Sequence, residues 1–410
     1  MSTGISGEAA PRHTANPAVL PPEAAFPKAL RATASRPDGL AALAEIAGWP
    51  GYAPTPLHDL PGLAARLGIG RLWYKDEGER FGLGSFKAMG GAYAVYRHLA
   101  KTIAGGKGPL PSSAELIAGN HRKATQAITV ATATDGNHGR SVAWGASLFG
   151  CRAVIFIHET VSEGRKAAIE AFGAEVRRVP GNYDDSLRHC AEAAAASGWQ
   201  VISDTGYEGY VEIPLEVMRG YAAMAEEAVR QLAAEPKPTH LFIQAGCGGL
   251  AAAVAGHLWE SWDRASPRVV VVEPERADCV WQSLEAGELV RVMGGLETIM
   301  AGLACGEVSL VAWDLLRQGV SDALAISDAP ARAAMQALAS GAGGDPAIIA
   351  GEAGVGGLAG LMAVAGDEAL RKKLGLGADA RVLVIGSEGA TDPALYREIV
   401  GRSPEDVKGR

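Results

Sequence analysis

The chain has 410 residues, of which 48% are hydrophobic and 20% charged, the proportions of an ordinary soluble globular protein. This length allows one large or two medium-sized domains with buried cores. The formal net charge of −8 argues against nucleic acid or an anionic membrane as a partner, because both attract clustered lysine and arginine. Five scattered cysteines without a CxxC pair predict reduced thiols rather than a disulfide framework or a zinc site.

The beginning of the chain shows no targeting signal. Residues 1–22 contain no positive segment that leads into an apolar core, and no run of about 18 apolar residues occurs, so we expect a cytoplasmic protein without a membrane span. Residues 1–40 are rich in Pro, Ala, Ser and Thr and show no clear period. They are predicted to form a tail, or an arm that wraps on the surface or on a partner subunit.

From about residue 70, short apolar runs alternate with Ala-rich helical stretches. Continuous apolar strands that alternate with helices indicate an α/β architecture with parallel sheets covered on both faces. The predicted strands are Leu72–Lys75, Ile128–Ala131, Ala153–Ile157, Glu175–Val179, Val201–Ser203, Leu241–Gln244, Val269–Val272 and Val382–Ile385. The predicted helices are Lys87–Leu99, Gly139–Leu148, Gly164–Phe172, Asp184–Ser197, Val217–Ala233 and Leu250–Glu260.

Eight strands are compatible with one wide sheet or with two sheets, and we expect two open parallel α/β domains. The smaller domain is predicted at residues 88–195, because this stretch has its own strand–helix repeats. The larger domain then comprises residues 41–87 and 196–410.

The first segment that carries chemistry is a Gly-rich turn, Gly82-Leu83-Gly84-Ser85-Phe86, followed by Lys87 at the start of an apolar helix. The dipole of a helix disfavours a cation at its N-terminus, so Lys87 is favoured as a neutral amine or imine. A lysine in that state is a competent Schiff-base nucleophile. Taken alone, however, such a segment more often marks a surface lysine near a helix end.

Three further segments place small or polar residues directly after an apolar strand, where open α/β sheets bind ligands. The stretch Thr132–Arg140 is the first, although it also fits a plain turn with Asp135 or Asn137 as the helix cap. The second, Gly246–Leu250, fits a phosphate cradle, and it also matches a dinucleotide motif with Glu273 as a ribose partner. In the third, Ser387 presents a hydroxyl after a late strand, or lies in a solvated turn.

Two other classes of site are disfavoured. The nine histidines form no HExxH or His-plus-carboxylate spacing, so we expect no catalytic metal. No GxSxG elbow is present, which disfavours an α/β-hydrolase.

Together and in this order, the segments resemble the fold-type II family of pyridoxal-phosphate enzymes, the group of serine and threonine dehydratases and the tryptophan synthase β-subunit. The resemblance covers about residues 70–395 and is specific as an ensemble. Within the group the chain looks most like the diaminopropionate ammonia-lyases. The segments that carry this second likeness are Lys75-Asp76-Glu77 with Arg80-Phe81-Gly82-Leu83, Thr134–Arg140, Asp204-Thr205 with Glu208-Gly209-Tyr210, Gly302–Glu307, and Ser387-Glu388-Gly389 with Thr391-Asp392.

The resemblance implies two α/β domains with pyridoxal 5′-phosphate between them, in a homodimer. It implies that Lys87, next to Phe86, holds the cofactor as an imine and that Asn137 touches the ring hydroxyl. Ser387 would meet the pyridine nitrogen as a neutral partner, and Asp135 and Asp204 would face the substrate. The phosphate would be bound by main-chain N–H groups of Gly246, Cys247, Gly248, Gly249 and Leu250.

The expected reaction is elimination of ammonia from 2,3-diaminopropionate, which yields pyruvate and two ammonia. Ordinary dehydratases of this group usually have a small neutral residue where this chain has Asp135. A carboxylate there stabilises a leaving ammonium group, and it can also act as a base on the second face of Cα. The chain departs from the family's usual pattern at Gly84-Ser85, Gly206-Tyr207 and Ala390.

Three alternatives stay open at this point. A dehydratase-like lyase would act on a hydroxylated amino acid, and Asp135 is the feature that discriminates against it. An NAD-dependent dehydrogenase built on the Gly246 loop and Glu273 leaves Lys87 unexplained. A non-catalytic scaffold that binds the cofactor or a metabolite is disfavoured by Lys87 together with two candidate acids.

Overall fold

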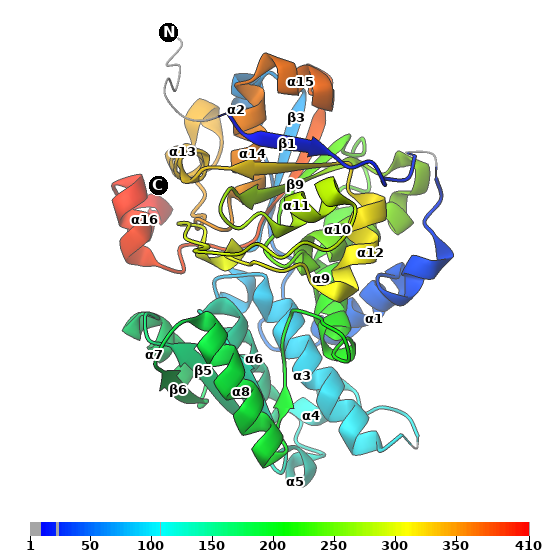
Figure 1. Cartoon of the computed structure of the whole chain (residues 1–410), viewed down its shortest axis with the longest axis vertical. Helices are drawn as coiled ribbons and strands as arrows, with labels where there is room; N and C mark the ends of the chain where they lie inside the picture. The colour runs from blue at the N-terminus through cyan, green and yellow to red at the C-terminus, as the bar shows by residue number, and fades with distance from the viewer. Residues whose placement is uncertain (1–9, 22–23, 107, 410) are drawn as a thin grey trace.

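Two sheets organise the protein in the computed structural model, which describes residues 10–21, 24–106 and 108–409. In Figure 1 the smaller sheet and its helices form the lower lobe, and the larger sheet lies above it. The larger sheet has seven strands in the order β1-β10-β9-β8-β11-β3-β2. Their bounds are β1 Arg12–Ala15, β10 Asp322–Ile326, β9 Arg268–Pro274, β8 His240–Gln244, β11 Arg381–Gly386, β3 Arg71–Asp76 and β2 Leu57–Asp59.

The five central strands of the larger sheet run parallel, and the short outer strands β1 and β2 pair antiparallel at its two edges. The smaller sheet has four parallel strands in the order β6-β5-β4-β7. Its strands are β6 Glu175–Val179, β5 Arg152–His158, β4 Thr129–Ala133 and β7 Gln200–Val201. The expected α/β architecture is therefore confirmed, and all eight predicted strands are present.

Helices cover the sheets. Those that precede or belong to the smaller sheet are α1 Arg36–Ile46, α2 Pro61–Leu67, α3 Lys87–Ala104, α4 Ser113–Ile117, α5 Arg122–Thr125, α6 Asn137–Phe149, α7 Glu163–Glu170 and α8 Tyr183–Ser197. Those that follow are α9 Glu212–Gln231, α10 Gly249–Trp262, α11 Cys279–Ala286, α12 Leu310–Gly319, α13 Asp328–Ser340, α14 Gly356–Ala365, α15 Glu368–Leu374, α16 Pro393–Val400 and α17 Pro404–Lys408.

Helix α3 connects the lobe of the smaller sheet to that of the larger sheet, because it packs against both α6 and α9. The crossing with α9 is very close: a Cβ at Gly220 would lie 2.4 Å from the carbonyl oxygen of Met89, which only glycine avoids. This contact fixes the first turn of α3, where Lys87 is located. Because α3 packs against helices of both lobes, the contacts do not assign it to one domain, and the residue boundaries of the two domains stay a prediction.

The stretch predicted as a tail or arm has local structure where it is described. Residues 12–15 form β1 on the edge of the larger sheet, and Asn16 continues that contact by donating from Nδ2 to the Val320 carbonyl oxygen at 2.6 Å. Helix α1 begins at Arg36, inside the predicted arm, after Ser35 accepts a hydrogen bond from the Asp38 amide. Residues 1–9 and 22–23 lie outside the described part.

Candidate active site

The predicted site residues follow strands that are neighbours in the sheets. In the larger sheet β3, β11 and β8 lie side by side and point the same way, and the chain after them leads to Lys87, Ser387 and the loop 246–249. In the smaller sheet the neighbours β4 and β7 are followed by Asp135 and Asp204. The carboxyl ends of parallel strands share one edge, so each sheet gathers its own set of side chains there.

Lys87 and Asp204 meet across the two layers as an ion pair between Nζ and Oδ2. His138 approaches the same carboxylate oxygen, with Nδ1 at 3.7 Å. Burial alone would lower the pKa of Lys87, but the Asp204 carboxylate raises it well above its usual value. The prediction of a neutral amine at this helix start is therefore wrong for the cofactor-free chain, because the Asp204 charge outweighs the helix dipole. Burial would likewise raise the pKa of Asp204, but the charge of Lys87 and then that of His138 lower it. The centroid of the Phe86 ring lies 5.4 Å from Lys87 Nζ, so this ring packs beside the ion pair.

The glycine loop forms a turn beside this ion pair. Gly248 has φ +87°, a left-handed conformation, and a Cβ there would lie 2.6 Å from Leu316. The loop opens α10 at Gly249 without a side-chain cap, so the backbone N–H groups of the first helical turn have no partner within the helix. The Cys247 sulfur lies 3.9 Å from the Asp204 carbonyl oxygen, so the loop contacts the segment that carries Asp204.

Three thiols surround the loop, and all five cysteines of the chain are free. A hydrogen bond from Cys305 lowers the pKa of the Cys247 thiol to about 7, against the effect of burial. The same contact, together with burial, raises the pKa of Cys305 well above its usual value. Cys279 donates to the Gly246 carbonyl oxygen at 3.5 Å. Cys279 and Cys305 are both free thiols, as the sequence predicts for all five cysteines.

Asn137 and Ser387 are each held by a buried neighbour. Asn137 donates from Nδ2 to Oε2 of Glu388 at 2.6 Å, and Ser387 Oγ accepts from Nε2 of Gln244 at 2.7 Å. Helix α6 is capped by Gly136 without any side-chain hydrogen bond, so the interpretation of Asp135 or Asn137 as its cap is wrong. The Asn137 side chain instead contacts Glu388, from the segment that follows β11.

Two carboxyl groups behind Asn137 favour the protonated form. Burial, followed by repulsion from Glu388, raises the pKa of Glu352 to about 8. Burial also raises the pKa of Glu388, although hydrogen bonds from the Ala353 amide and Asn137 oppose this shift. Sequence reasoning did not assign either residue to the site, because their effect arises only where two loops meet.

Asp135 and Asp204 share a neighbour in Tyr183, the first residue of α8. Tyr183 as a residue is 41% exposed, yet burial and then the carboxylates of Asp204 and Asp135 raise its pKa well above the usual value. Both acids therefore lie near the Tyr183 hydroxyl. Tyr183 was missed by sequence reasoning, although its place after β6, at the same edge as Asp135, is a signal of the kind used for the other segments.

A buried ion cluster lies at the start of the loop that leads to Lys87. Arg80, which is 1% exposed, donates from Nε to Glu77 and from Nη2 to Glu227, both at 2.7 Å. Lys75 adds a second cation 2.8 Å from Glu227, so the cluster is balanced in charge. Phe81, directly after Arg80, has a left-handed φ of +54°, which this anchoring holds in place.

Glu273 does not act as a ribose partner. It is fully buried and accepts hydrogen bonds from the backbone N–H groups of Val280 at 2.9 Å and Trp281 at 2.6 Å. Both carboxylate oxygens of Glu273 bind backbone N–H groups at the start of α11. The dehydrogenase interpretation therefore loses its ribose-binding residue. Of the departures, Gly206 is buried, whereas Tyr207 is 58% exposed and stacks on Tyr210 with ring centroids 5.0 Å apart.

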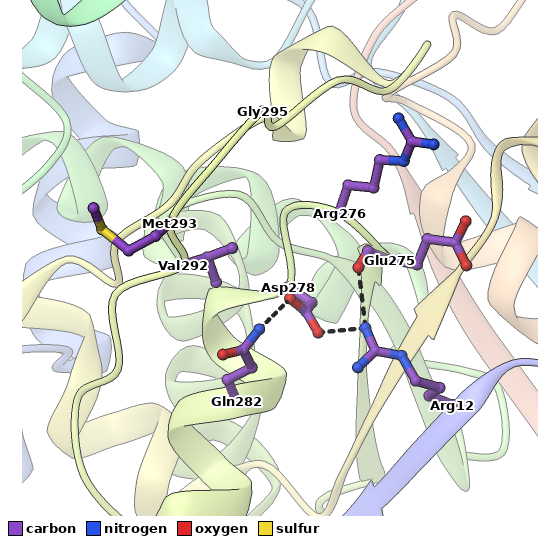
Figure 2. A pocket seen from close by; sticks show the side chains of 8 residues that line it. All are labelled: Arg12, Glu275, Arg276, Asp278, Gln282, Val292, Met293 and Gly295. Atoms are coloured by element: carbon purple, nitrogen blue, oxygen red, sulfur yellow. Dashed lines mark hydrogen bonds and ion pairs between the residues drawn. The ribbon is translucent and has the colours of Figure 1, made fainter.

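A separate open cavity of about 500 Å³ lies beside β1 (Figure 2). Two of its charged groups are paired with each other, since Asp278 accepts from Arg12 at 2.5 Å, and Asp278 also accepts from Gln282 at 2.8 Å. None of the predicted site residues lines it, so we assign the chemistry to the site around the Lys87–Asp204 pair. Within the ranges that the structure describes, no cluster of His, Cys, Asp or Glu is arranged to hold a metal, and no helix combines the length and the apolar character of a membrane span.

Comparison with known proteins agrees with this geometry. The sequence model of the family described as "Pyridoxal-phosphate dependent enzyme" matches residues 49–388. The chain belongs to this family of pyridoxal-phosphate dependent enzymes. Among curated proteins, it is similar to diaminopropionate ammonia-lyase of Escherichia coli strain K12, with 41% identity over 356 residues that cover 85% of this chain and 88% of the relative. The Salmonella typhimurium enzyme of the same name is also 41% identical, over 86% of this chain and 90% of the relative.

Solved structures extend the likeness to the fold. The crystal structure of holo diaminopropionate ammonia-lyase from Escherichia coli has a TM-score of 0.87 and 38% identity, and it covers 95% of this chain and 96% of that chain. As a fold-type II pyridoxal-phosphate dependent enzyme, the chain offers groups that fit its cofactor. These are a lysine amine for the aldehyde, a glycine turn at a helix start for the phosphate, and a buried hydroxyl for the ring.

Proposed function

We propose that this protein eliminates ammonia from 2,3-diaminopropionate and, with one water, yields pyruvate and two ammonia. The observation that carries the proposal is Asp135, a carboxylate at a usually neutral position of the family. It lies near Tyr183, as does Asp204, the ion-pair partner of Lys87. The identity of 41% with enzymes named diaminopropionate ammonia-lyase supports the same substrate.

The chain's own residues divide the reaction between them. Bound pyridoxal phosphate supplies an electron sink for the bond broken at Cα. Lys87 Nζ takes the Cα proton from one face, and Asp204, its ion-pair partner, stabilises the ammonium form that results. Asp135 stabilises the positive charge of the β-ammonium group, which leaves as ammonia, and it serves as the base on the other face of Cα. Hydrolysis of the released enamine gives pyruvate and the second ammonia.

The cofactor contacts are proposals of the same kind. Main-chain N–H groups of residues 246–250 bind the phosphate, where α10 begins with its first donors unpaired. Asn137 meets the ring hydroxyl, with Glu388 holding its amide in place. Ser387 meets the ring nitrogen as an uncharged partner.

The substrate is tested with Asp135→Asn, which keeps the size of the side chain and removes its charge. Pyruvate release is measured from D- and L-diaminopropionate and from serine. We expect the wild-type protein to favour diaminopropionate, and the variant to lose most of its turnover of at least one enantiomer. Asp184→Asn, at an exposed position of α8, is the matched control and should change neither rate.

Unchanged rates for both enantiomers in Asp135→Asn would contradict the role of this carboxylate. Faster release of pyruvate from serine than from diaminopropionate by the wild-type protein would favour the hydroxy-amino-acid lyase instead.

We also propose a homodimer in the cytoplasm, as the family resemblance implies. Light scattering coupled to size-exclusion chromatography should give twice the chain mass of 42.3 kDa. Fractionation of the source cells should recover the activity with cytoplasmic markers. A monomeric mass, or activity in the membrane or secreted fraction, would overturn the respective proposal.

A further inference from the structure

Gln244, the last residue of β8, is 1% exposed and has every side of its amide group in contact with a polar atom. Its Nε2 lies 3.0 Å from the Ile385 carbonyl oxygen and 3.3 Å from that of Gly354. Its Oε1 lies 3.2 Å from the backbone nitrogen of Gly357. Carbonyl oxygens only accept and a backbone N–H only donates, so these contacts fix which end of the amide is nitrogen.

The orientation of this amide determines that of Ser387. Nε2 of Gln244 points at Ser387 Oγ, 2.7 Å away, and occupies one lone pair of the hydroxyl oxygen. The hydroxyl hydrogen must then point away from Gln244. Across the described part of the chain, Ser387 Oγ donates to no protein acceptor, although the residue is only 3% exposed. A buried hydroxyl in this situation is directed toward a ligand that accepts.

We propose that Gln244 is a positioning residue that holds the Ser387 hydroxyl as a hydrogen-bond donor to the ring nitrogen of the cofactor. The inference rests on the proposed contact between Ser387 and the ring. A donated O–H needs a nitrogen with a free lone pair, whereas a protonated pyridine would need an acceptor. Gln244 therefore keeps the ring nitrogen unprotonated without touching it. The neutral amide is suited to this task, because a carboxylate in its place would accept the Ser387 proton.

The direct test measures the ring nitrogen itself. Holoenzyme is prepared with pyridoxal phosphate labelled with ¹⁵N in the ring, and the ¹⁵N chemical shift is recorded without substrate at one pH. We expect the wild-type signal at the position of an unprotonated pyridine nitrogen. In Gln244→Glu, Ser387 donates to the new carboxylate and offers its lone pair to the ring, so the signal should move toward the protonated position.

Two controls separate positioning from a general structural effect. Gln336→Glu replaces an exposed glutamine of α13 whose Nε2 donates to the Ile399 carbonyl oxygen of α16 at 2.8 Å, and it should leave the signal unchanged. In a Ser387→Ala background, Gln244→Glu should add no further shift, because its effect passes through Ser387. An equal shift in that background, or no shift in Gln244→Glu alone, overturns the proposal.

A buried carboxylate can prevent folding, and Gln244→Met provides the second variant. It keeps the length of the side chain but removes both the donor and the acceptor. Because the hydroxyl can then rotate, its hydrogen bond to the ring nitrogen weakens and the ¹⁵N signal should move from the wild-type position toward that of Ser387→Ala. An unchanged wild-type signal would contradict the inference. Lack of diaminopropionate turnover in the wild type would overturn the proposed function while leaving this measurement valid.

Discussion

The amine of Lys87 and the carboxylate of Asp204 form an ion pair where the loops of the two sheets meet. One partner opens α3 and the other follows β7, so the pair exists only when both layers are folded together. The charge of each residue stabilises that of the other against the cost of burial. The predictions that follow test this pair and the groups around it.

Lys87→Ala removes the proposed base and the amine that holds the cofactor. Turnover should fall by on the order of 10²–10⁴-fold, the usual contribution of a positioned base. The visible absorption of the protein with pyridoxal phosphate should lose its borohydride-sensitive component. Lys101→Ala is the matched control on the same helix, since Lys101 pairs with Glu212 and Glu216 away from the cleft. An unchanged absorption spectrum in Lys87→Ala would contradict the assignment.

Cys247 should be the most reactive thiol when the cofactor has been removed. Its pKa of about 7 predicts alkylation by iodoacetamide with a midpoint near neutral pH, because the thiolate is the nucleophile. Burial raises the pKa of Cys151 and Cys190 to about 12, so these thiols should stay unmodified at pH 8. Mass spectrometry of the digested protein measures each site.

Two further measurements locate the cause. Cys305→Ala removes the hydrogen bond to Cys247 and should move the alkylation midpoint to higher pH. Pyridoxal phosphate should protect Cys247, since the loop around it is the proposed phosphate site. Equal alkylation with and without the cofactor would argue that the phosphate binds elsewhere.

Glu352 predicts a pH dependence of stability in the cofactor-free protein. In the folded chain the pKa of Glu352 is about 8, whereas its ordinary pKa, as in the unfolded chain, is 4.5. Between these values the folded state binds more protons, so its stabilisation, complete below 4.5, is lost as pH rises toward 8. The free energy of unfolding, measured with urea at several pH values in this range, should fall less steeply with pH in Glu352→Gln than in the wild type. Glu368→Gln, at an exposed position of α15, should keep the wild-type slope.

Arg80→Met should destabilise the fold strongly. The substitution leaves Glu77 and Glu227 buried with one cation fewer, and breaking a buried ion pair in this way costs about 3–5 kcal/mol. Arg188→Met, which removes an exposed pair with Asp185, should change the midpoint of urea unfolding little. Equal midpoints for the two variants would show that the buried cluster contributes no more than a surface pair.

Much of the fold is predictable because the central strands are continuously apolar, as in β8 and β9. The strands missed by the prediction lack this signal: β1 and β2 are short and largely polar, and β10 combines an aspartate with two alanines. Helix α14 was also missed, since it begins with Gly356-Gly357, residues of poor helix propensity. Packing against the larger sheet stabilises it instead.

The site residues likewise fall into those that the sequence predicts and those that it does not. Asn137, the glycine loop and Ser387 each carry a local signal, small or polar residues that follow a strand, and Lys87 carries another, a Gly-rich turn before an apolar helix. Gln244 and Glu388 carry none, because an amide or carboxylate next to such a segment has no fixed partner until distant loops pack together. Their partners lie 143 and 251 residues away in sequence. Contacts of this range come from the tertiary fold, which a single sequence does not specify locally.

The short antiparallel strands β1 and β2 have a consequence for how copies of the chain assemble. Each occupies one border of the larger sheet, so neither border offers a long row of unpaired backbone groups to another molecule. Two copies that associate must therefore do so through helix faces and loops instead of extending a shared sheet. Two short segments from the first 60 residues of the chain thus limit the open-ended addition of strands to this sheet.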